Sequence, residues 1–217
     1  MHRSGTSALA GSLEQHGLHL GTVSTQDTHN VKGNRESAEL RRLNEDVLRT
    51  SGGAWRAPPP TVEWQPEHWE RARRAIAKHA GQPVWGFKDP RTLMTLEGWL
   101  TLVPDLEFVG VFRHPSRVAR SLERRGGIDR EAGVALWTAY NSRLRDLHEQ
   151  RSFPLLCFDD EPSELQRKLD EVARLLGLRD TAPDEPFFEP ALRDEVPVEP
   201  ASPEAEDLYG DLRARAL

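Results

Sequence analysis

Cysteine is almost absent from this chain of 217 residues: Cys157 stands alone, so no internal disulfide can form. Because Cys157 lies in the apolar run 155–158, its surroundings predict a buried thiol. No apolar run is long enough to cross a bilayer, and no signal peptide precedes the expected fold. These absences predict a protein without a membrane partner, located in the reducing cytoplasm.

An excess of positive charge is missing as well. The formal net charge is −6 at pH 7, which disfavours nonspecific binding to nucleic acid or to an anionic membrane surface. Hydrophobic residues make up 37% of the chain and charged residues 29%, a balance typical of a globular domain rather than a disordered chain. The length suits one domain with a hydrophobic core. We therefore expect no nucleic-acid partner.

Apolar segments and helical patterns alternate along the chain. Short apolar runs predict buried strands at residues 84–88, 107–112 and 153–158. Apolar residues at helical spacing predict helices before, between and after these strands, at 67–80, 130–150 and 165–176. This alternation predicts an α/β fold with a parallel sheet covered by helices on both faces.

The domain organisation follows from the same pattern. We assign residues 1–180 to one α/β domain. Residues 181–217 begin with a segment rich in proline and acidic residues, which predicts an extended tail that ends in a short helix at 205–217.

The first residues carry a phosphate-binding pattern, made of Arg3, Ser4, Gly5, Thr6 and Ser7 before an aliphatic helix. A cation, hydroxyl groups and a glycine at a helix N-terminus suit a phosphate, because backbone N–H groups and the helix dipole favour an anion there. The GxxxxGK[ST] spacing of a Walker A loop is absent, which disfavours nucleotide-triphosphate chemistry, including that of a divergent kinase. The alternative interpretation is a polar helix cap without a ligand.

A second anion-binding pattern follows the strand expected at 107–112. Arg113 stands at the carboxyl end of this strand, Pro115 suits the first turn of a helix, and Ser121 lies two turns into it. Ligands of open α/β sheets bind at this end of the strands, so Arg113 and Ser121 can converge on one phosphate. The alternative for Arg113 is a surface salt bridge. The later arginines of the helix are expected on its solvated face, with one of them able to assist the anion: Arg117, Arg120, Arg124 and Arg125.

Candidates for chemistry lie in two further segments. Lys88 and Asp89 follow the strand expected at 84–88, and Glu36 lies in a polar turn before a helix expected at 39–49. Structural roles are the alternatives: Asp89 could hold Lys88 or Arg91 in an ion pair, and Glu36 could be an acidic first-turn residue that favours the helix dipole. The chain has no cluster with metal-ligand spacing, so we expect no metal.

These segments resemble the sulfotransferases that use 3′-phosphoadenosine 5′-phosphosulfate (PAPS), most closely the bacterial and Golgi-type members. Residues 2–7, HRSGTS, are similar to their 5′-phosphosulfate loop, residues 113–121 to their 3′-phosphate motif, and residues 86–91 to a lysine-containing segment. The resemblance implies that the 5′-phosphosulfate is bound by Arg3, Ser4, Gly5, Thr6 and Ser7. It implies that the 3′-phosphate is bound by Arg113 and Ser121.

The resemblance also implies catalytic roles. Arg3 would contact the bridging oxygen, Lys88 would stabilise the transferred group, and Glu36 would act as the general base, with His2 as the second choice of base. The co-substrate would be PAPS, the product 3′,5′-adenosine bisphosphate, and the acceptor a hydroxyl or amine of a small molecule or saccharide.

The fold implied by the resemblance is a P-loop-like three-layer arrangement with its central parallel sheet flanked by helices. Its first strand is expected to be missing or truncated, because only Met1 precedes the loop. The alternative to an enzyme is a truncated, non-catalytic module of sulfotransferase-like fold that binds a nucleotide or another protein. The sequence does not predict an oligomeric state.

Overall fold

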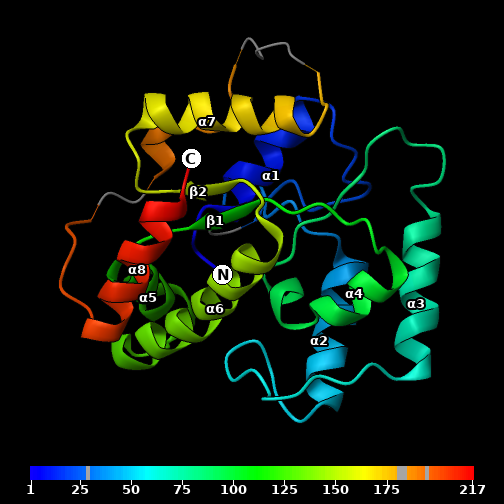
Figure 1. Ribbon diagram of the computed structural model, residues 1–217, viewed down its shortest axis with the longest axis horizontal. Coiled ribbons are helices and arrows are strands. Elements are labelled where there is room, and N and C mark those ends of the chain that lie inside the picture. The colour runs from blue at the N-terminus through cyan, green and yellow to red at the C-terminus, as the bar shows by residue number, and fades with distance from the viewer. Residues whose placement is uncertain (28–29, 180–184, 194–195) are drawn as a thin grey trace. The chain divides into compact units, whose positions relative to one another are not determined.

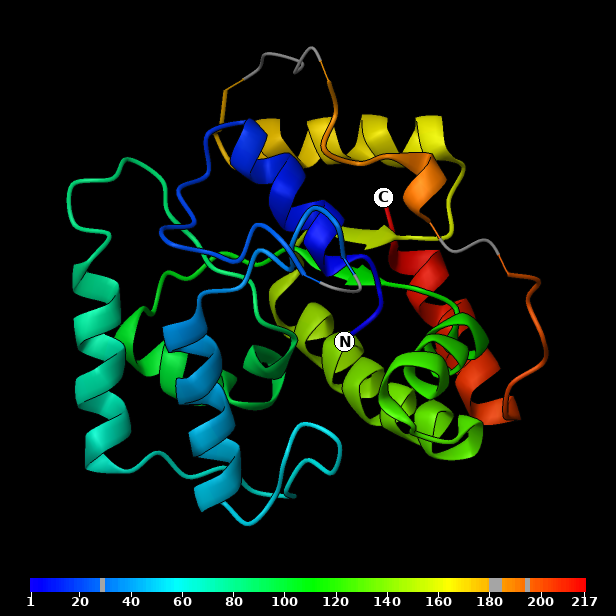
Figure 2. The same ribbon diagram turned by 180° about the vertical axis from the view of Figure 1, so that it is seen from behind.

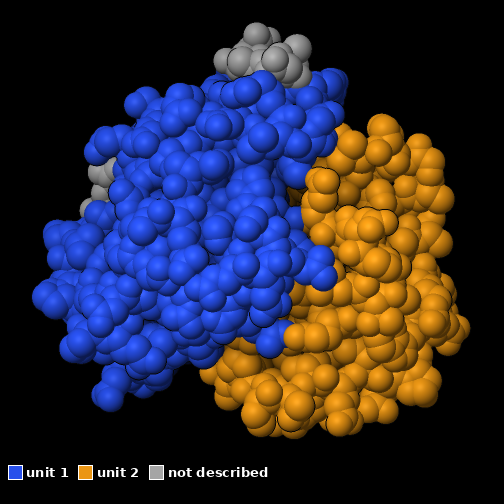
Figure 3. Space-filling view, viewed as in Figure 1, with its two compact units in different colours: residues 1–16, 108–217 blue, residues 17–107 orange. Residues whose placement is uncertain are grey.

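The computed structural model describes residues 1–27, 30–179, 185–193 and 196–217 as a mixed α/β structure that is mostly helical (Figures 1 and 2). The chain forms two compact units (Figure 3). Unit 1 combines residues 1–16 with residues 108–217, and unit 2 consists of residues 17–107. The expected boundary between residues 180 and 181, and the start of the expected tail at 181–184, lie outside the described residues.

Unit 1 contains a pair of parallel strands. β1 (Gly110–Phe112) and β2 (Leu155–Cys157) are aligned so that Val111 lies opposite Leu156. Both strands are fully buried, as expected for short apolar runs, although each is shorter than its sequence predicts. A parallel pair needs a crossover connection, which α5 (Pro115–Gly126) and α6 (Arg130–Arg151) provide. The α/β class with a parallel sheet is thereby confirmed.

Helices flank this strand pair on either side. Figures 1 and 2 place α1 (Thr6–Gln15) and α7 (Pro162–Leu175) on one side, and α5, α6 and α8 (Pro203–Arg215) on the other. A short 3-10 helix, η2, covers Pro190–Leu192. The apolar faces of the helices turn inward: α8, for example, buries Leu208 and Leu212. No helix in the described ranges is both long enough and apolar enough to span a membrane.

Unit 2 is built from helices around a small core. Its elements are α2 (Ala38–Thr50), α3 (Pro66–Ala77), the 3-10 helix η1 (Pro90–Met94) and α4 (Leu96–Leu102). The helices predicted at 39–49 and 67–80 are confirmed in α2 and α3. The buried core of this unit consists of Leu40, Leu43, Val47, Ala72, Ala75 and Trp99.

The prediction of a strand at 84–88 is wrong. Trp85 makes a single parallel bridge with His19, through hydrogen bonds from His19 N to Val84 O and from Gly86 N to His19 O, both 3.1 Å. The partner segment is too short for a ladder, because Gly17 and Gly21 on either side of it have positive φ and turn the chain away. Residue 88 therefore follows an extended segment rather than a strand.

Packing around a helical glycine gives a test of the unit 2 core. A Cβ atom at Gly98 in α4 would overlap the indole of Trp64, whereas one at Gly210 in α8 would meet no atom within 4 Å. We expect Gly98→Ala to lower the free energy of unfolding by about 1–3 kcal/mol through overpacking. Gly210→Ala should raise it by about 0.5–1 kcal/mol, because alanine favours a helix. Urea denaturation of both variants measures the difference, and equal effects would contradict the packing at Gly98.

Candidate functional site

The loop before α1 follows a left-handed course. Arg3 has φ 65° and Gly5 has φ 88°. For Arg3, which carries a side chain, this left-handed conformation costs about 1–3 kcal/mol. Helix α1 begins at Thr6, and no side chain caps it from the Gly5 position. The backbone N–H groups of its first turn are those that bind an anion in loops of this kind.

Ser4 is the least exposed residue of this loop. Its exposed fraction is 0%, and its hydroxyl has no hydrogen-bond partner among the described residues. A buried hydroxyl without a partner costs about 1–3 kcal/mol, so such groups are rare in folded proteins. An orphaned hydroxyl in an uncapped, left-handed loop fits a site that holds a phosphate oxygen.

One phenyl ring links this loop to the strand end. A Cβ atom at position 5 would overlap the ring of Phe158, so the loop can pack there only with glycine. The guanidinium of Arg113 lies 5.5 Å from the centre of the same ring. The loop and the strand-end arginine therefore share one packing surface within unit 1.

The two predicted anion-binding motifs meet directly. Arg3 Nε donates a hydrogen bond to Ser121 Oγ at 3.0 Å, between residues 118 positions apart. Ser121 is buried in α5 together with Val118, which lies one turn before it. The fold thus brings the residues expected at the 5′-phosphosulfate next to one expected at the 3′-phosphate.

Arg113 is buried rather than on the surface. Its exposed fraction is 5%, and its Nε lies 3.6 Å from Asp159 Oδ1, so Arg113 does form an ion pair, as the alternative interpretation predicts, but a buried one rather than one on the surface. The indole of Trp137 donates to its carbonyl oxygen at 2.8 Å and fixes the backbone at the strand end. Burial lowers the pKa of Arg113, Asp159 opposes this effect, and the charges of Arg117 and Arg193 lower the pKa further.

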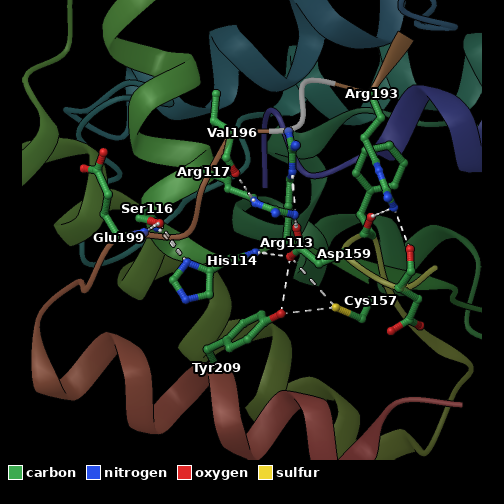
Figure 4. Close-up of polar contacts among 12 residues, drawn as sticks. Arg113, His114, Ser116, Arg117, Cys157, Asp159, Arg193, Val196, Glu199 and Tyr209 are labelled. Carbon is green, nitrogen blue, oxygen red and sulfur yellow. Dashed lines mark hydrogen bonds and ion pairs between the residues drawn. The ribbon is translucent and has the colours of Figure 1, made fainter. Parts of the chain in front are cut away.

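Arg113, Arg117 and Asp159 form a cluster of charged side chains in unit 1 (Figure 4). Arg117 Nη1 lies 2.6 Å from Asp159 Oδ1, and its Nε donates to Val196 O at 3.0 Å. The expectation of a solvated face is therefore wrong for Arg117, whose side chain is 18% exposed. Sequence reasoning missed Asp159, although a signal was present. Asp159 follows β2 as Arg113 follows β1, and the carboxyl ends of parallel strands meet at one edge of a sheet.

In unit 2, Lys88 and Glu36 form an ion pair. Lys88 Nζ donates to Glu36 Oε1 at 2.7 Å, and the two side chains are 11% and 13% exposed. Burial lowers the pKa of Lys88, while the carboxylate of Glu36 opposes that shift. The helix-dipole alternative for Glu36 is wrong, because the residue precedes Ser37, the N-cap of α2, and points to Lys88.

The backbone places Glu36 through a tight turn. Gly33 has φ 75°, and a Cβ atom there would overlap the backbone of residues 24 and 25. Hydrogen bonds of 3.1 Å from Ser24 N to Glu36 O and from Arg35 N to Ser24 O tie the segment before α2. Position 33 requires glycine, because a side chain there would collide with the backbone of residues 24 and 25.

A buried polar network supports the pair. Asp89 accepts from Arg91 Nη1 at 2.8 Å and from Asn44 Nδ2 at 2.9 Å, so Asp89 holds Arg91 rather than Lys88. Asn44 Oδ1 in turn accepts from Thr95 Oγ1 at 2.8 Å and from the Trp99 indole at 3.0 Å. Arg91 Nη1 lies 3.7 Å from Glu36 Oε2. The network connects the Lys88 and Glu36 pair to the core of unit 2.

Other candidate residues have structural surroundings. His2 lies edge-on to Tyr140, with ring centres 6.3 Å apart. The ring of His114 accepts from Ser116 N and caps α5. Cys157 is buried, as predicted. The described residues contain no group of three or more histidine, cysteine, aspartate or glutamate side chains placed to hold a metal ion.

Comparison of the chain with protein-family models, with curated proteins and with solved structures gives no match in any of the three. Each unit is therefore interpreted from its own geometry. Unit 1 contains a cationic cluster with an uncapped loop, and unit 2 contains a buried lysine–glutamate pair.

A matched pair of glycines tests the loop packing. Gly5 and Gly177 both have positive φ, but a Cβ atom would overlap Phe158 at position 5 and meets nothing within 4 Å at position 177. We expect Gly177→Ala to cost about 1–2 kcal/mol of stability, the penalty of the left-handed conformation alone. Gly5→Ala should cost about 1–3 kcal/mol more, because the loop must also leave the ring. Urea denaturation measures both, and equal losses would show that Phe158 does not pack against the loop.

Proposed function

We propose that the chain is a PAPS-dependent sulfotransferase, which moves a sulfuryl group to a hydroxyl or amine acceptor, with saccharides among the acceptor classes. One observation carries this proposal: the hydrogen bond of 3.0 Å between Arg3 and Ser121. It joins two segments that each suit a phosphate and that are distant in the sequence. A nucleotide with phosphates at both its 5′ and 3′ positions needs two such segments side by side.

The residues of unit 1 fit this co-substrate. The 5′-phosphosulfate would be held by Arg3, Ser4, Gly5, Thr6 and Ser7, a role supported by the orphaned hydroxyl of Ser4 and the uncapped start of α1. The 3′-phosphate would be held by Arg113 and Ser121, both of which are buried. Buried arginines make strong, directional hydrogen bonds to phosphate oxygens. When bound, PAPS supplies the activated sulfuryl group and its phosphate leaving group.

Chemical roles are assigned to three residues. Arg3 would meet charge that develops on the bridging oxygen, and Lys88 would stabilise the transferred group. Glu36 would take the proton of the acceptor as general base. Its Oε1 is occupied by Lys88 at 2.7 Å, whereas its Oε2 lies 3.7 Å from Arg91, beyond hydrogen-bond distance. We therefore assign the proton to Oε2.

The finer description of the fold and location belongs to the same proposal. A P-loop-like, three-layer arrangement is supported by the parallel pair of β1 and β2 with helices on either side. A cytoplasmic location is supported by the single, buried thiol of Cys157, which suits a reducing compartment.

Binding of 3′,5′-adenosine bisphosphate tests the nucleotide site. We expect the purified chain to bind this product in calorimetry, and Arg113→Ala to weaken the affinity about 10- to 100-fold, the effect of one lost charge-assisted hydrogen-bond donor. Arg167→Ala is the matched control, because this arginine of α7 is exposed and pairs with Glu171. Absence of binding, or binding that Arg113→Ala leaves unchanged, contradicts the proposal.

Sulfuryl transfer tests the role of Glu36. We expect turnover of radiolabelled PAPS with a panel of hydroxyl and amine acceptors, and a loss of about 10²- to 10⁴-fold in Glu36→Gln, the usual contribution of a general base. Affinity for 3′,5′-adenosine bisphosphate should be unchanged. Glu39→Gln is the control, because Glu39 is exposed at 43% and pairs with Lys78. Full turnover in Glu36→Gln would disprove the base, and nucleotide binding without turnover on any acceptor would favour the non-catalytic module.

A further inference from the structure

The carboxylate of Asp159 lies at the centre of the cluster in unit 1 (Figure 4). Its Oδ1 lies 2.6 Å from Arg117 Nη1 and 3.6 Å from Arg113 Nε. Its Oδ2 accepts the backbone N–H of His114 at 2.6 Å and the hydroxyl of Tyr209 at 3.3 Å. One oxygen thus faces two guanidinium groups, and the other is held by neutral donors.

The neutral donors fix the position of the carboxylate. The His114 N–H belongs to the N-cap residue of α5, directly after Arg113, so Asp159 is tied to the backbone that carries the arginine. Tyr209 comes from α8, and its ring packs edge-on against His114 and Phe112 at 4.7 Å and 5.7 Å. These contacts leave the carboxylate little freedom to move when an anion binds the arginines.

The charged contacts of Asp159 act on the arginines. Arg113, Arg117 and Arg193 carry like charges: burial lowers the pKa of Arg113 most, and the charges of Arg117 and Arg193 lower it further. A carboxylate facing two of them offsets their repulsion and holds their planar groups in one arrangement. Arginine binds phosphate best when this arrangement exists before the ligand arrives.

We propose that Asp159 is the positioning residue that holds Arg113 and Arg117 ready for the 3′-phosphate, and that Tyr209 makes α8 part of this site. The inference rests on the proposed function, and it adds residues from the end of β2 and from the C-terminal helix. Asp159 positions the arginines rather than competing with the phosphate, because its Oδ2 accepts hydrogen bonds from the neutral donors His114 N and Tyr209 Oη. A phosphate that bound the arginines would not release those bonds.

A comparison of two ligands isolates this role. Calorimetry with 3′,5′-adenosine bisphosphate and with 5′-AMP gives a ratio of affinities that reports the 3′-phosphate alone. We expect Asp159→Asn to lower this ratio about tenfold or more and Tyr209→Phe to lower it severalfold, while affinity for 5′-AMP stays within about twofold. Asp146→Asn is the control, because Asp146 is exposed in α6 and pairs with Arg145. It should leave the ratio unchanged.

Each other outcome is decisive. Equal losses for both ligands in Asp159→Asn would mean a merely structural role, and a higher ratio would mean that Asp159 competes with the phosphate. Either result overturns the inference. Should Asp159→Asn fail to fold, Tyr209→Phe decides alone, and an unchanged ratio in that variant overturns the role of α8. A wild-type chain that binds both ligands equally, or neither, refutes the proposed function itself.

Discussion

Burial of the Arg113 guanidinium is the constraint on which the organisation of unit 1 depends. A buried cation is stable only with a partner for its charge and with fixed hydrogen-bond acceptors nearby. The partner is Asp159, which the adjacent parallel strand places at the same sheet edge. The short strands, the N-terminus of α5 and the C-terminal helix α8 all contribute to this one arrangement, because Asp159 also binds His114 N and Tyr209.

Unit 2 meets the same requirement with a different set of groups. Lys88 and Glu36 neutralise each other's charge at a distance of 2.7 Å. Beside them, the buried amide of Asn44 donates a hydrogen bond to the carboxylate of Asp89. Desolvation lowers the pKa of Lys88, which leaves the ammonium more acidic than an exposed lysine. A pair of this kind is suited to chemistry, since its two members already face each other, but each of them is costly to bury alone.

Much of the secondary structure could be predicted because it is local. Helices α2, α3, α6 and α7 follow from apolar spacing, and Gly177, with φ 66°, ends the last of these segments as glycine often does. The structure of residues 84–88 could not be predicted correctly, because a strand needs a partner segment of adequate length. Here the partner segment around His19 is kept short by the turns at Gly17 and Gly21. Arg117 was likewise misjudged, since helical periodicity does not reveal that Asp159 lies beside it.

The sequence by itself determined the residue types of the candidate site. Arg3, Ser4, Gly5, Arg113, Ser121, Lys88 and Glu36 are recognisable from local patterns of charge, hydroxyl groups and glycine beside strand ends and helix starts. Only the tertiary structure decided which of them meet: Arg3 with Ser121, and Lys88 with Glu36. It alone showed Asp159 beside Arg113 and Arg117, and Tyr209 hydrogen-bonded to Asp159. Contacts between residues far apart in the chain depend on strand pairing and helix packing, which local periodicity does not encode.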